Sequence, residues 1–427
     1  MAASARPRIV IVGGGFGGLA CARKLAGKPV DVTLVDARDY HLFTPLLYQV
    51  ATALLNPADI AYPFRAILRK AKNVRFHQAT VAAVDFERKV VRTGNGRELP
   101  YDELVLATGS VSDYFGNPAL AEATLGMKNL EQAQRLRNHV LACLEHAAQA
   151  ENDVEQSAWL TFVVVGGGAT GVEYAGALAE LRKLVGREYP EFSALRMRVV
   201  VVEGADRLLP AFPEKLGRYA QKVLERKGAE IVTETVMTAA DEKGATLSSG
   251  SEIAARTIVW SAGVRASETG GMQELERGRS FRLVVDERLH PAGQPNVYAI
   301  GDAAGGENAL PMLSAPAMQQ GRYVARAILA GVRGHEAPGP FRYKDKGTMA
   351  VIGRGAAVAN VRGFQLTGFL GWLAWLGVHL YYVVGFRNRV AVFFHWGWDY
   401  VRRDRPTRMI TTVEPDSVAD SLGAIDS

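Results

Sequence analysis

Residues 10–20 read VIVGGGFGGLA, an apolar run followed by a cluster of glycines. The β-branched residues before Gly13 predict a strand, and residues 19–25 predict a short helix. Gly13, Gly15 and Gly18 satisfy the pattern G-x-G-x-x-G, in which the first glycine allows a tight turn and the second lets the backbone approach a pyrophosphate. The third lets the helix pack closely on the strand, so that the helix N-terminus can stabilise phosphate charge.

The next strand supplies an acid at the position that this motif requires. Residues 31–36 form an apolar run that ends on Asp36, 23 residues after Gly13. A carboxylate at this place accepts hydrogen bonds from the ribose hydroxyls of an adenosine. A lone G-x-G-x-x-G is a weak signal, but strand, turn, helix and acid occur here in the expected order and together predict a dinucleotide site.

The same unit recurs about 150 residues later, in residues 163–181, which read VVVGGGATGVEYAGALAEL. The second turn contains Gly166, Gly168 and Gly171. The strand that follows ends on Glu203, and an acid there favours NAD over NADP because it repels a 2′-phosphate. Arg207 lies four residues further on and could offset that repulsion, so the sequence leaves this choice open. Two such units predict two bound dinucleotides, the arrangement of a flavoprotein that is reduced by a nicotinamide.

The composition of the 427-residue chain is that of a globular protein, with 48% apolar and 22% charged residues, and its length predicts two or three domains. The net charge of +6 permits contact with an anionic surface without requiring it, and we expect no nucleic-acid partner. Cys21 and Cys143 form no CxxC pair, which excludes a disulfide-reductase reaction, and we expect no metal site. The first residues show no secretory signal, so we expect a reducing compartment.

The order of these motifs resembles the flavoproteins with two dinucleotide-binding domains, and within them the type II NADH dehydrogenases. These are single-subunit NADH:quinone oxidoreductases that do not pump protons. The similarity covers about residues 7–405. Besides the two glycine turns it rests on DARDYHLFTPLLYQVAT at 36–52, ATGS at 107–110, VYAIGDAA at 297–304, AMQQGRYVA at 317–325, DKGTMAVIGR at 345–354 and LYYVVGFRNR at 380–389.

The resemblance implies a binding site for FAD around the first turn. The implied contacts are Gly13, Gly14, Gly15, Phe16, Gly17 and Gly18 at the pyrophosphate; Asp36, Ala37 and Val81 at the adenosine; His41, Thr44, Pro45, Ala107, Thr108, Gly109 and Lys346 around the flavin; and Asp302 at the ribityl and phosphate region. Many members carry an Ala-Gln pair before the helix at 317–325, in contact with flavin and quinone. Here Ser314 and Ala315 stand in that region, and we do not expect Gln319 or Gln320 to replace the missing glutamine.

The resemblance also implies a binding site for NADH and a functional glutamate. NADH would be held by Gly166, Gly168, Gly171 and Glu203, with Ala262 and Gly263 passing close to it. Glu173 matches the glutamate that the family places between its nicotinamide and quinone sites, and it is the candidate catalytic residue. An acid in the first turns of a helix is also favoured by the helix dipole, so its position alone does not establish a function.

The C-terminal region predicts attachment to a membrane surface. Residues 364–386 contain no Lys, Arg, Asp or Glu and are long enough to span a bilayer. In residues 390–401 the apolar side chains fall on one face of a helix, which is typical of a helix lying in a membrane surface. Six arginines could meet anionic head groups: Arg387, Arg389, Arg402, Arg403, Arg405 and Arg408. A buried dimer interface and a spanning helix are the alternatives.

The predicted fold is α/β, with an NADH-binding Rossmann-like domain inserted into an FAD-binding one, plus a C-terminal amphipathic helical membrane-binding segment. The expected ranges are 1–115 and 290–345 for the FAD domain, 116–289 for the NADH domain and 346–427 for the C-terminal segment. A helix is also predicted over 56–72.

The predicted function is that of a flavoprotein that oxidises NADH through FAD and reduces a membrane quinone without pumping protons. We expect it to be a homodimer bound peripherally, as a monotopic protein, to the cytoplasmic face of a membrane through residues 364–408. Two other functions fit the two nucleotide motifs. One is a soluble NADH-dependent flavin reductase of a small redox protein, which would not need the apolar C-terminal region. The other is a flavin-based redox sensor, which would not turn over NADH steadily.

Overall fold

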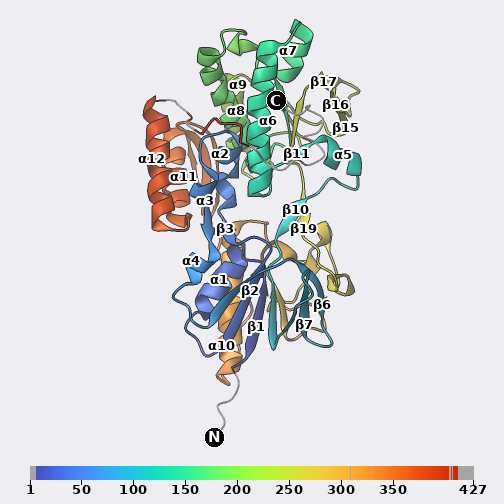
Figure 1. Ribbon diagram of the computed structural model, residues 1–427, viewed down its shortest axis with the longest axis vertical. Coiled ribbons are helices and arrows are strands. Elements are labelled where there is room, and N and C mark those ends of the chain that lie inside the picture. Colours follow the sequence, from blue (N-terminus) through green and yellow to red (C-terminus); the bar gives the residue numbers. More distant parts are fainter. Residues whose placement is uncertain (1–5, 308, 403–404, 406, 412–427) are drawn as a thin grey trace. The chain divides into compact units, whose positions relative to one another are not determined.

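The structure is a computed structural model that describes residues 6–307, 309–402, 405 and 407–411 (Figure 1). By its internal contacts the chain forms two compact units, and each unit is built from three segments. Unit 1 comprises Met1–Leu42, Ala61–Val111 and Val264–Lys346. Unit 2 comprises Phe43–Ile60, Ser112–Gly263 and Gly347–Ser427. These ranges differ from the predicted domains, because the chain returns to unit 1 at Val264 rather than at 290 and residues 43–60 belong to unit 2.

Unit 1 is built on a five-stranded parallel sheet in the order β21-β9-β1-β2-β5. Its strands are β1 (Arg8–Val12), β2 (Asp31–Asp36), β5 (Val74–Gln78), β9 (Glu103–Leu106) and β21 (Val297–Ala299). Helices α1 (Phe16–Leu25) and α10 (Ser314–Val332) pack together on one face, with a core that includes Ile9 and Ile11. The first predicted βαβ unit is therefore confirmed.

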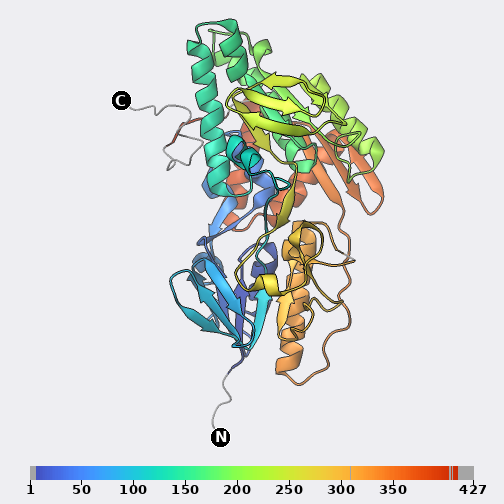
Figure 2. The ribbon, with the colours of Figure 1, turned by 90° about the vertical axis from the view of Figure 1, so that its right-hand side faces the viewer.

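The other face of this sheet is covered by a three-stranded antiparallel sheet, as the 90° view of Figure 2 also shows. Its strands are β6 (Val81–Asp85), β7 (Val90–Thr93) and β8 (Glu98–Pro100). Val10 and Val12 of β1 pack on this side, opposite to Ile9 and Ile11, because successive side chains of a strand point to opposite faces. The shorter elements of unit 1 are β3 (Tyr40–Leu42), β4 (Ala61–Pro63), α4 (Phe64–Leu68), β19 (Val264–Ala266), η3 (Met272–Glu274), η4 (Arg279–Phe281), β20 (Leu283–Val284), η5 (Gly301–Ala303) and β22 (Ala304–Gly305).

Unit 2 repeats this plan with a parallel sheet in the order β11-β18-β12-β13-β14. The strands are β11 (Leu125–Gly126), β12 (Thr161–Val165), β13 (Arg198–Val202), β14 (Ala229–Val232) and β18 (Thr257–Trp260). One face packs on the antiparallel strands β15 (Met237–Asp241), β16 (Gly244–Leu247) and β17 (Glu252–Ala254). Its helices are α5 (Pro118–Ala123), α6 (Leu130–Gln149), α7 (Asp153–Trp159), α8 (Ala169–Glu188) and α9 (Glu214–Arg226), with the short η2 (Ala194–Arg196) after α8. The second βαβ unit is thus confirmed as well.

The last part of unit 2 is a three-stranded antiparallel sheet followed by two helices. The strands are β23 (Thr348–Gly353), β24 (Ala356–Val361) and β25 (Phe364–Thr367), and the helices are α11 (Gly368–Tyr382) and α12 (Phe386–Arg402). The uncharged stretch 364–386 is therefore divided between a strand and the 15-residue α11. Within the described residues we find no helix that combines the length and the apolar character needed to cross a membrane.

The helix predicted over 56–72 is wrong. The structure has α3 (Pro57–Ile60), then β4, then α4. Residues 61–63 pair with β3, and Pro63 caps α4 in an extended conformation that a continuous helix could not contain. Before α3, the segment η1 (Thr44–Leu46) and α2 (Leu47–Ala51) pack into unit 2, where α2 contacts α6 and α8.

Candidate active site

The first glycine turn has the conformation that its sequence requires. Gly13 has φ +98°, and a Cβ there would lie 2.2 Å from the carbonyl oxygen of Ala107. A Cβ on Gly18 would lie 1.9 Å from the carbonyl oxygen of Gly13. Gly15, by contrast, has nothing within 4 Å of its Cβ position, and it begins α1 without a side-chain cap or an acid in the first turn. This open, uncapped helix N-terminus fits a pyrophosphate.

The side chains of Asp36 and His41 form hydrogen bonds with the backbone of this turn. The Asp36 carboxylate accepts hydrogen bonds from the backbone N–H of Gly14 at 2.6 Å and of Arg38 at 2.9 Å. Desolvation nevertheless raises the pKa of Asp36. The Nδ1 atom of buried His41 lies 3.0 Å from the carbonyl oxygen of Gly14, and its ring meets Phe16 edge-on at 5.2 Å. Burial lowers the pKa of His41 to about 4, so this imidazole is neutral and donates from Nδ1.

The structure brings most of the predicted FAD residues into unit 1, but not all. Ser110 donates to the carboxylate of Asp302 at 2.5 Å, and Thr108 donates to the carbonyl of Ser267 at 3.2 Å. Unit 1 contains all of the predicted FAD contacts except Thr44 and Pro45, which lie in η1 of unit 2.

The glutamines of the α10 region are engaged elsewhere. Gln320 accepts from the backbone N–H of Gly301 at 2.7 Å, and Gln319 donates to the carbonyl of Lys344 at 2.9 Å. Neither side chain is therefore free to take the place of the missing glutamine. Ser314 and Ala315 form the first turn of α10, and Lys346 is exposed at the end of unit 1.

The second turn has the same conformational features as the first. Gly166 has φ +102°, and a Cβ there would lie 2.6 Å from the Cα of Ala262. A Cβ on Gly171 would lie 1.9 Å from the carbonyl oxygen of Gly166, whereas Gly168 has open space and begins α8 without a side-chain cap. Ala262 thus lies beside the turn. Gly263 instead packs on residues 113–115, since its Cβ would meet the carbonyl of Asp113 at 2.9 Å.

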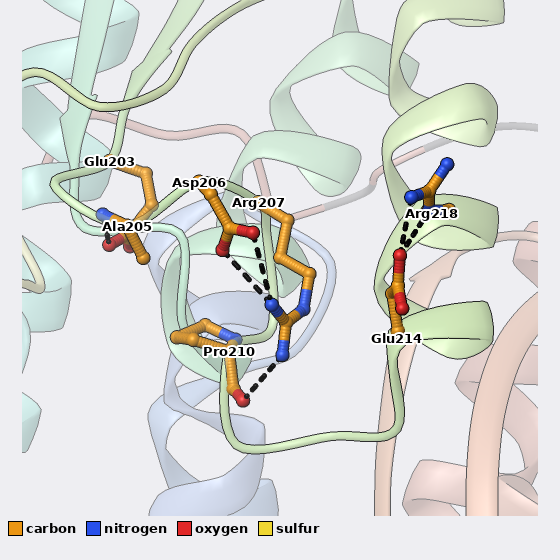
Figure 3. A network of polar contacts seen from close by, with 7 residues as sticks. All are labelled: Glu203, Ala205, Asp206, Arg207, Pro210, Glu214 and Arg218. Atoms are coloured by element: carbon orange, nitrogen blue, oxygen red, sulfur yellow. Dashed lines mark hydrogen bonds and ion pairs between the residues drawn. The ribbon is translucent and has the colours of Figure 1, made fainter.

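Glu203 and Arg207 lie in the loop after β13 (Figure 3). The Glu203 carboxylate accepts from the backbone N–H of Gly167 at 2.5 Å and of Ala205 at 2.7 Å, as Asp36 does in unit 1. The guanidinium of Arg207 contacts the carboxylate of its neighbour Asp206 at 3.0 and 3.3 Å, and the carbonyl of Pro210 at 3.5 Å. Arg207, which could have offset the charge of Glu203, is therefore paired with Asp206 instead.

Glu173 lines a cavity within unit 2. The backbone N–H of Val351 donates to its carboxyl at 3.3 Å. Desolvation raises the pKa of Glu173 to about 8, and the hydrogen bond from Val351 and the nearby Trp375 indole only partly oppose this. The cavity of about 60 Å³ has room for a few water molecules. Its lining comes from α2, α8, β23, α11 and α12 and includes Tyr48, Gln49, Glu180, Trp372, Trp375, Leu376, Trp396 and Arg405.

Sequence reasoning missed most of this lining. Tyr48 and Gln49 lie in a stretch that carries the family resemblance, and the one available signal was that these two polar side chains interrupt an apolar run. The aromatic residues of α11 and α12 were assigned to a membrane surface. Trp375, however, is 1% exposed and stands in the cavity wall.

The expectation that six arginines meet lipid head groups is wrong for Arg405. Arg405 is buried and donates to the carbonyl oxygens of Thr52 at 2.7 Å and Ala177 at 2.8 Å. Arg408 forms an ion pair with Glu188. Arg387 and Arg389 are exposed, the side chain of Arg402 is not described, and Arg403 lies outside the described residues.

Two polar side chains of helix α12 contact the rest of unit 2, while several of its apolar side chains are exposed. Asn388 is 2% exposed and donates to the carbonyl of Ala58 at 3.0 Å, while His395 Nδ1 lies 3.1 Å from Asp59. Apart from Arg387 and Arg389, the exposed side chains that the structure describes in the two C-terminal helices are apolar or aromatic. They are Phe369, Leu370, Leu373, Val378, Tyr381, Tyr382, Phe386, Val390, Phe393, Phe394 and Trp398, which we call the apolar face. So many exposed apolar side chains on two neighbouring helices indicate contact with a membrane or another protein.

Comparison with known sequences agrees with this architecture. The sequence profile described as pyridine nucleotide-disulphide oxidoreductase matches residues 7–321. The chain is 40% identical to the type II NADH:quinone oxidoreductase NdhA of Mycobacterium tuberculosis, over 96% of this chain and 91% of the relative. It is 32% identical to a type II NADH:quinone oxidoreductase of Staphylococcus haemolyticus, over 85% of this chain and 92% of that protein.

Comparison of structures supports the same fold. The chain superposes with a TM-score of 0.87 on the structure of NDH2 from Plasmodium falciparum in complex with NADH, at 20% identity, over 94% of this chain and 99% of that chain. The family assignment rests on two findings. The chain contains two glycine turns, each with its acid, and it is 40% identical to a type II NADH:quinone oxidoreductase over nearly its full length. The chain belongs to the pyridine nucleotide-disulphide oxidoreductase family and, within it, to the type II NADH:quinone oxidoreductases.

Proposed function

We propose that quinone is reduced at the cavity lined by Glu173, with FAD held by unit 1 and NADH by unit 2. The chain is an FAD-dependent enzyme that oxidises NADH and reduces a quinone without pumping protons. Bound FAD supplies the two-electron chemistry that links these two reactions. One observation carries the placement of the quinone: the half-buried carboxylic acid of Glu173 faces a cavity whose wall includes α11 and α12, the helices that bear the apolar face.

The protein groups for FAD follow from the geometry of unit 1. The uncapped N-terminus of α1, with the open position at Gly15, would receive the pyrophosphate, and Asp36, already fixed by Gly14, would accept from the adenosine ribose. Thr108, Gly109 and Asp302 follow strands β9 and β21 at the carboxyl edge of the same sheet, where ligands of such folds bind.

The corresponding groups for NADH lie in unit 2. Gly168 at the start of α8 would receive its pyrophosphate, and Glu203 would accept from its adenosine ribose. Since Glu203 is fixed by two backbone N–H groups and Arg207 is paired with Asp206, a 2′-phosphate would meet uncompensated negative charge. NADH is therefore the preferred substrate over NADPH.

Replacing Glu203 with alanine is expected to raise kcat/KM for NADPH by about 10- to 100-fold, because like-charge repulsion of several kcal/mol is removed. Adding Asp206→Asn, which releases Arg207, should raise it further. The measurement is kcat/KM for both nucleotides. The matched control is Glu214→Ala, which removes an acid that is paired with Arg218 on α9 (Figure 3). If the ratio of kcat/KM for NADH to that for NADPH is unchanged in the Glu203 variants, another group selects the nucleotide.

Glu173 is suited to provide a proton to the quinone. Quinone reduction consumes two electrons and two protons, and a carboxyl with a pKa of about 8 is mostly protonated at neutral pH. The cavity as it stands holds only a few waters. A quinone head group must therefore displace these waters and part of the wall, where Trp372 and Leu376 of α11 are only partly buried.

Membrane attachment through the apolar face follows from the orientation of α12. Such a helix makes polar contacts with its own protein and exposes aromatic side chains. This arrangement is suited to binding in the interface of a bilayer. Quinones of respiratory membranes are lipid-soluble, so a cavity beside this face gives them a short path. We place the enzyme peripherally on the cytoplasmic face, where NADH is available, and as a homodimer; Cys21 and Cys143, free and buried, suit a reducing compartment.

The double variant Phe393→Glu, Phe394→Glu should release the protein from lipid vesicles. The two rings are 58% and 67% exposed, and each buried Phe contributes about 1.5–3 kcal/mol, so partitioning should fall about 100-fold or more. Flotation with vesicles containing anionic lipid measures it. Val154→Glu, at an apolar residue of α7 that is 79% exposed, is the matched control. A double variant that still floats, but changes from dimer to monomer, would identify the apolar face as a subunit interface.

The two other functions make different predictions. A soluble flavin reductase of a small redox protein has no use for the apolar face. A flavin-based sensor would not sustain turnover, so steady oxidation of NADH with a short-chain quinone excludes it.

A further inference from the structure

Tyr48 is a cavity residue with no part in the chemistry described so far. It lies in α2, is 6% exposed and lines the cavity together with Glu173. Its hydroxyl oxygen lies 2.7 Å from Nε2 of Gln49. Oε1 of Gln49 in turn lies 2.8 Å from the indole Nε1 of Trp396 on α12.

This chain of contacts has a fixed direction. An indole N–H can only donate, so the atom of Gln49 that faces Trp396 must be its carbonyl oxygen. The amide nitrogen of Gln49 therefore faces Tyr48 and donates to it. The Tyr48 oxygen accepts this hydrogen bond, which leaves the hydroxyl proton of Tyr48 for another acceptor.

No protein acceptor for that proton lies within hydrogen-bond distance in the part of the chain that the structure describes. The group stays protonated, because burial raises the pKa of Tyr48 well above its usual value. A buried O–H without an acceptor is costly, so its presence at a cavity indicates that something in the cavity accepts from it.

We propose that Tyr48 donates a hydrogen bond to a carbonyl oxygen of the quinone, and that Gln49 and Trp396 position it to do so. This inference rests on the placement of the quinone proposed above. A quinone carbonyl can only accept, and it gains negative charge as electrons arrive. An oriented O–H in a water-poor cavity stabilises that charge. Tyr48 keeps its proton throughout, and proton delivery remains the role of Glu173.

Gln49 and Trp396 act through Tyr48 and are positioning residues. Because Trp396 belongs to α12, the donor is oriented by the helix whose other side carries the apolar face. The side chain that holds the quinone oxygen is thereby tied to the helix proposed to lie in the membrane.

Tyr48→Phe tests the donor directly. The holoenzyme variant should be reduced by NADH at a rate within twofold of wild type, while its anaerobic reoxidation by a short-chain ubiquinone or menadione slows by 10- to 100-fold. Reoxidation by ferricyanide, which needs no hydrogen-bond donor, should be unchanged. Tyr174→Phe is the matched control, because Tyr174 is also buried, is adjacent to Glu173 in sequence and has a hydroxyl with no partner among the described residues, but does not line the cavity.

Gln49→Glu tests the positioning role while retaining the tyrosine. A carboxylate at this place accepts from Tyr48 instead of donating to it, so the hydroxyl proton turns away from the cavity. Reoxidation by quinone should slow about as much as in Tyr48→Phe, and the double variant should be no slower than either single variant. Additive losses would mean that Gln49 acts independently of Tyr48.

The outcomes separate this inference from the proposed function. If Tyr48→Phe is reoxidised by quinone at the wild-type rate while Glu173→Gln is slow, the quinone site stands and Tyr48 is not its donor. If both variants react with quinone at the wild-type rate, the cavity is not the quinone site and both proposals fail. Slowing in Tyr48→Phe but not in Tyr174→Phe, with ferricyanide unaffected, supports the donor.

Discussion

Alanine at Gly168 is expected to abolish most NADH binding while leaving FAD in place, and alanine at Gly15 is expected to do the reverse. Both positions offer open space for a Cβ, so neither substitution strains the protein itself. Each Cβ would instead occupy the place where the backbone approaches a pyrophosphate. Hydrogen bonds to charged groups contribute about 1.5–3 kcal/mol each, so losing one or two should weaken binding by about 10- to 100-fold or more.

The measurements are the flavin content of the purified variants and the KM for NADH. Gly168→Ala should purify with full flavin and a strongly raised KM, and Gly15→Ala should lose flavin. Gly331→Ala is the control, because Gly331 lies in α10 with open space around its Cβ position and away from both turns. If Gly168→Ala lost flavin, or Gly15→Ala raised only the KM, the assignment of FAD to unit 1 and NADH to unit 2 would be wrong.

Replacing Glu173 with glutamine is expected to slow quinone reduction by about 100-fold while changing flavin reduction by NADH less than twofold. Positioned proton donors contribute about 10²- to 10⁴-fold in such reactions, and glutamine keeps the size of the side chain but has no acidic proton. Stopped-flow measurement of the two half-reactions separates the effects. Equal slowing of both half-reactions would argue against a role in proton delivery.

The pH dependence gives an independent check on Glu173. Burial raises its pKa to about 8, so the protonated form dominates at neutral pH and is lost as the pH rises through that value. Wild-type quinone reduction should therefore be flat below pH 8 and fall about tenfold per unit well above it. Glu173→Gln should show no such fall. A wild-type rate that increases with pH in this range would require Glu173 to act as a base.

The sequence predicted those parts of the site that depend on local geometry. In each turn the first glycine has a positive φ, and a Cβ on the third would lie 1.9 Å from the carbonyl oxygen of the first, so both positions require glycine. The pairing of Asp36 with Gly14 and of Glu203 with Gly167 follows from the same short-range topology.

The cavity could not be predicted in this way, because its residues come from distant parts of the chain. Tyr48, Glu173 and Trp375 meet only when α2, α8 and α11 pack together in unit 2. Arg405 shows the same limit. In the sequence it is one arginine of a basic stretch and nothing distinguishes it from the others, but two backbone carbonyls, of Thr52 and Ala177, hold it inside the protein.

The helix over 56–72 failed for a related reason. Its apolar spacing is compatible with a helix, but residues 61–63 pair with β3, and this contact between segments about 20 residues apart in sequence outweighs the local preference.

Anaerobic titration of the purified holoenzyme with NADH, followed by addition of a short-chain quinone, shows whether the flavin passes electrons from NADH to a quinone. The flavin absorbance should bleach with one equivalent of NADH and return in full with one equivalent of quinone. Flavin that is bleached by NADH but stays bleached in the presence of quinone would contradict the assignment and favour a reductase of a different acceptor.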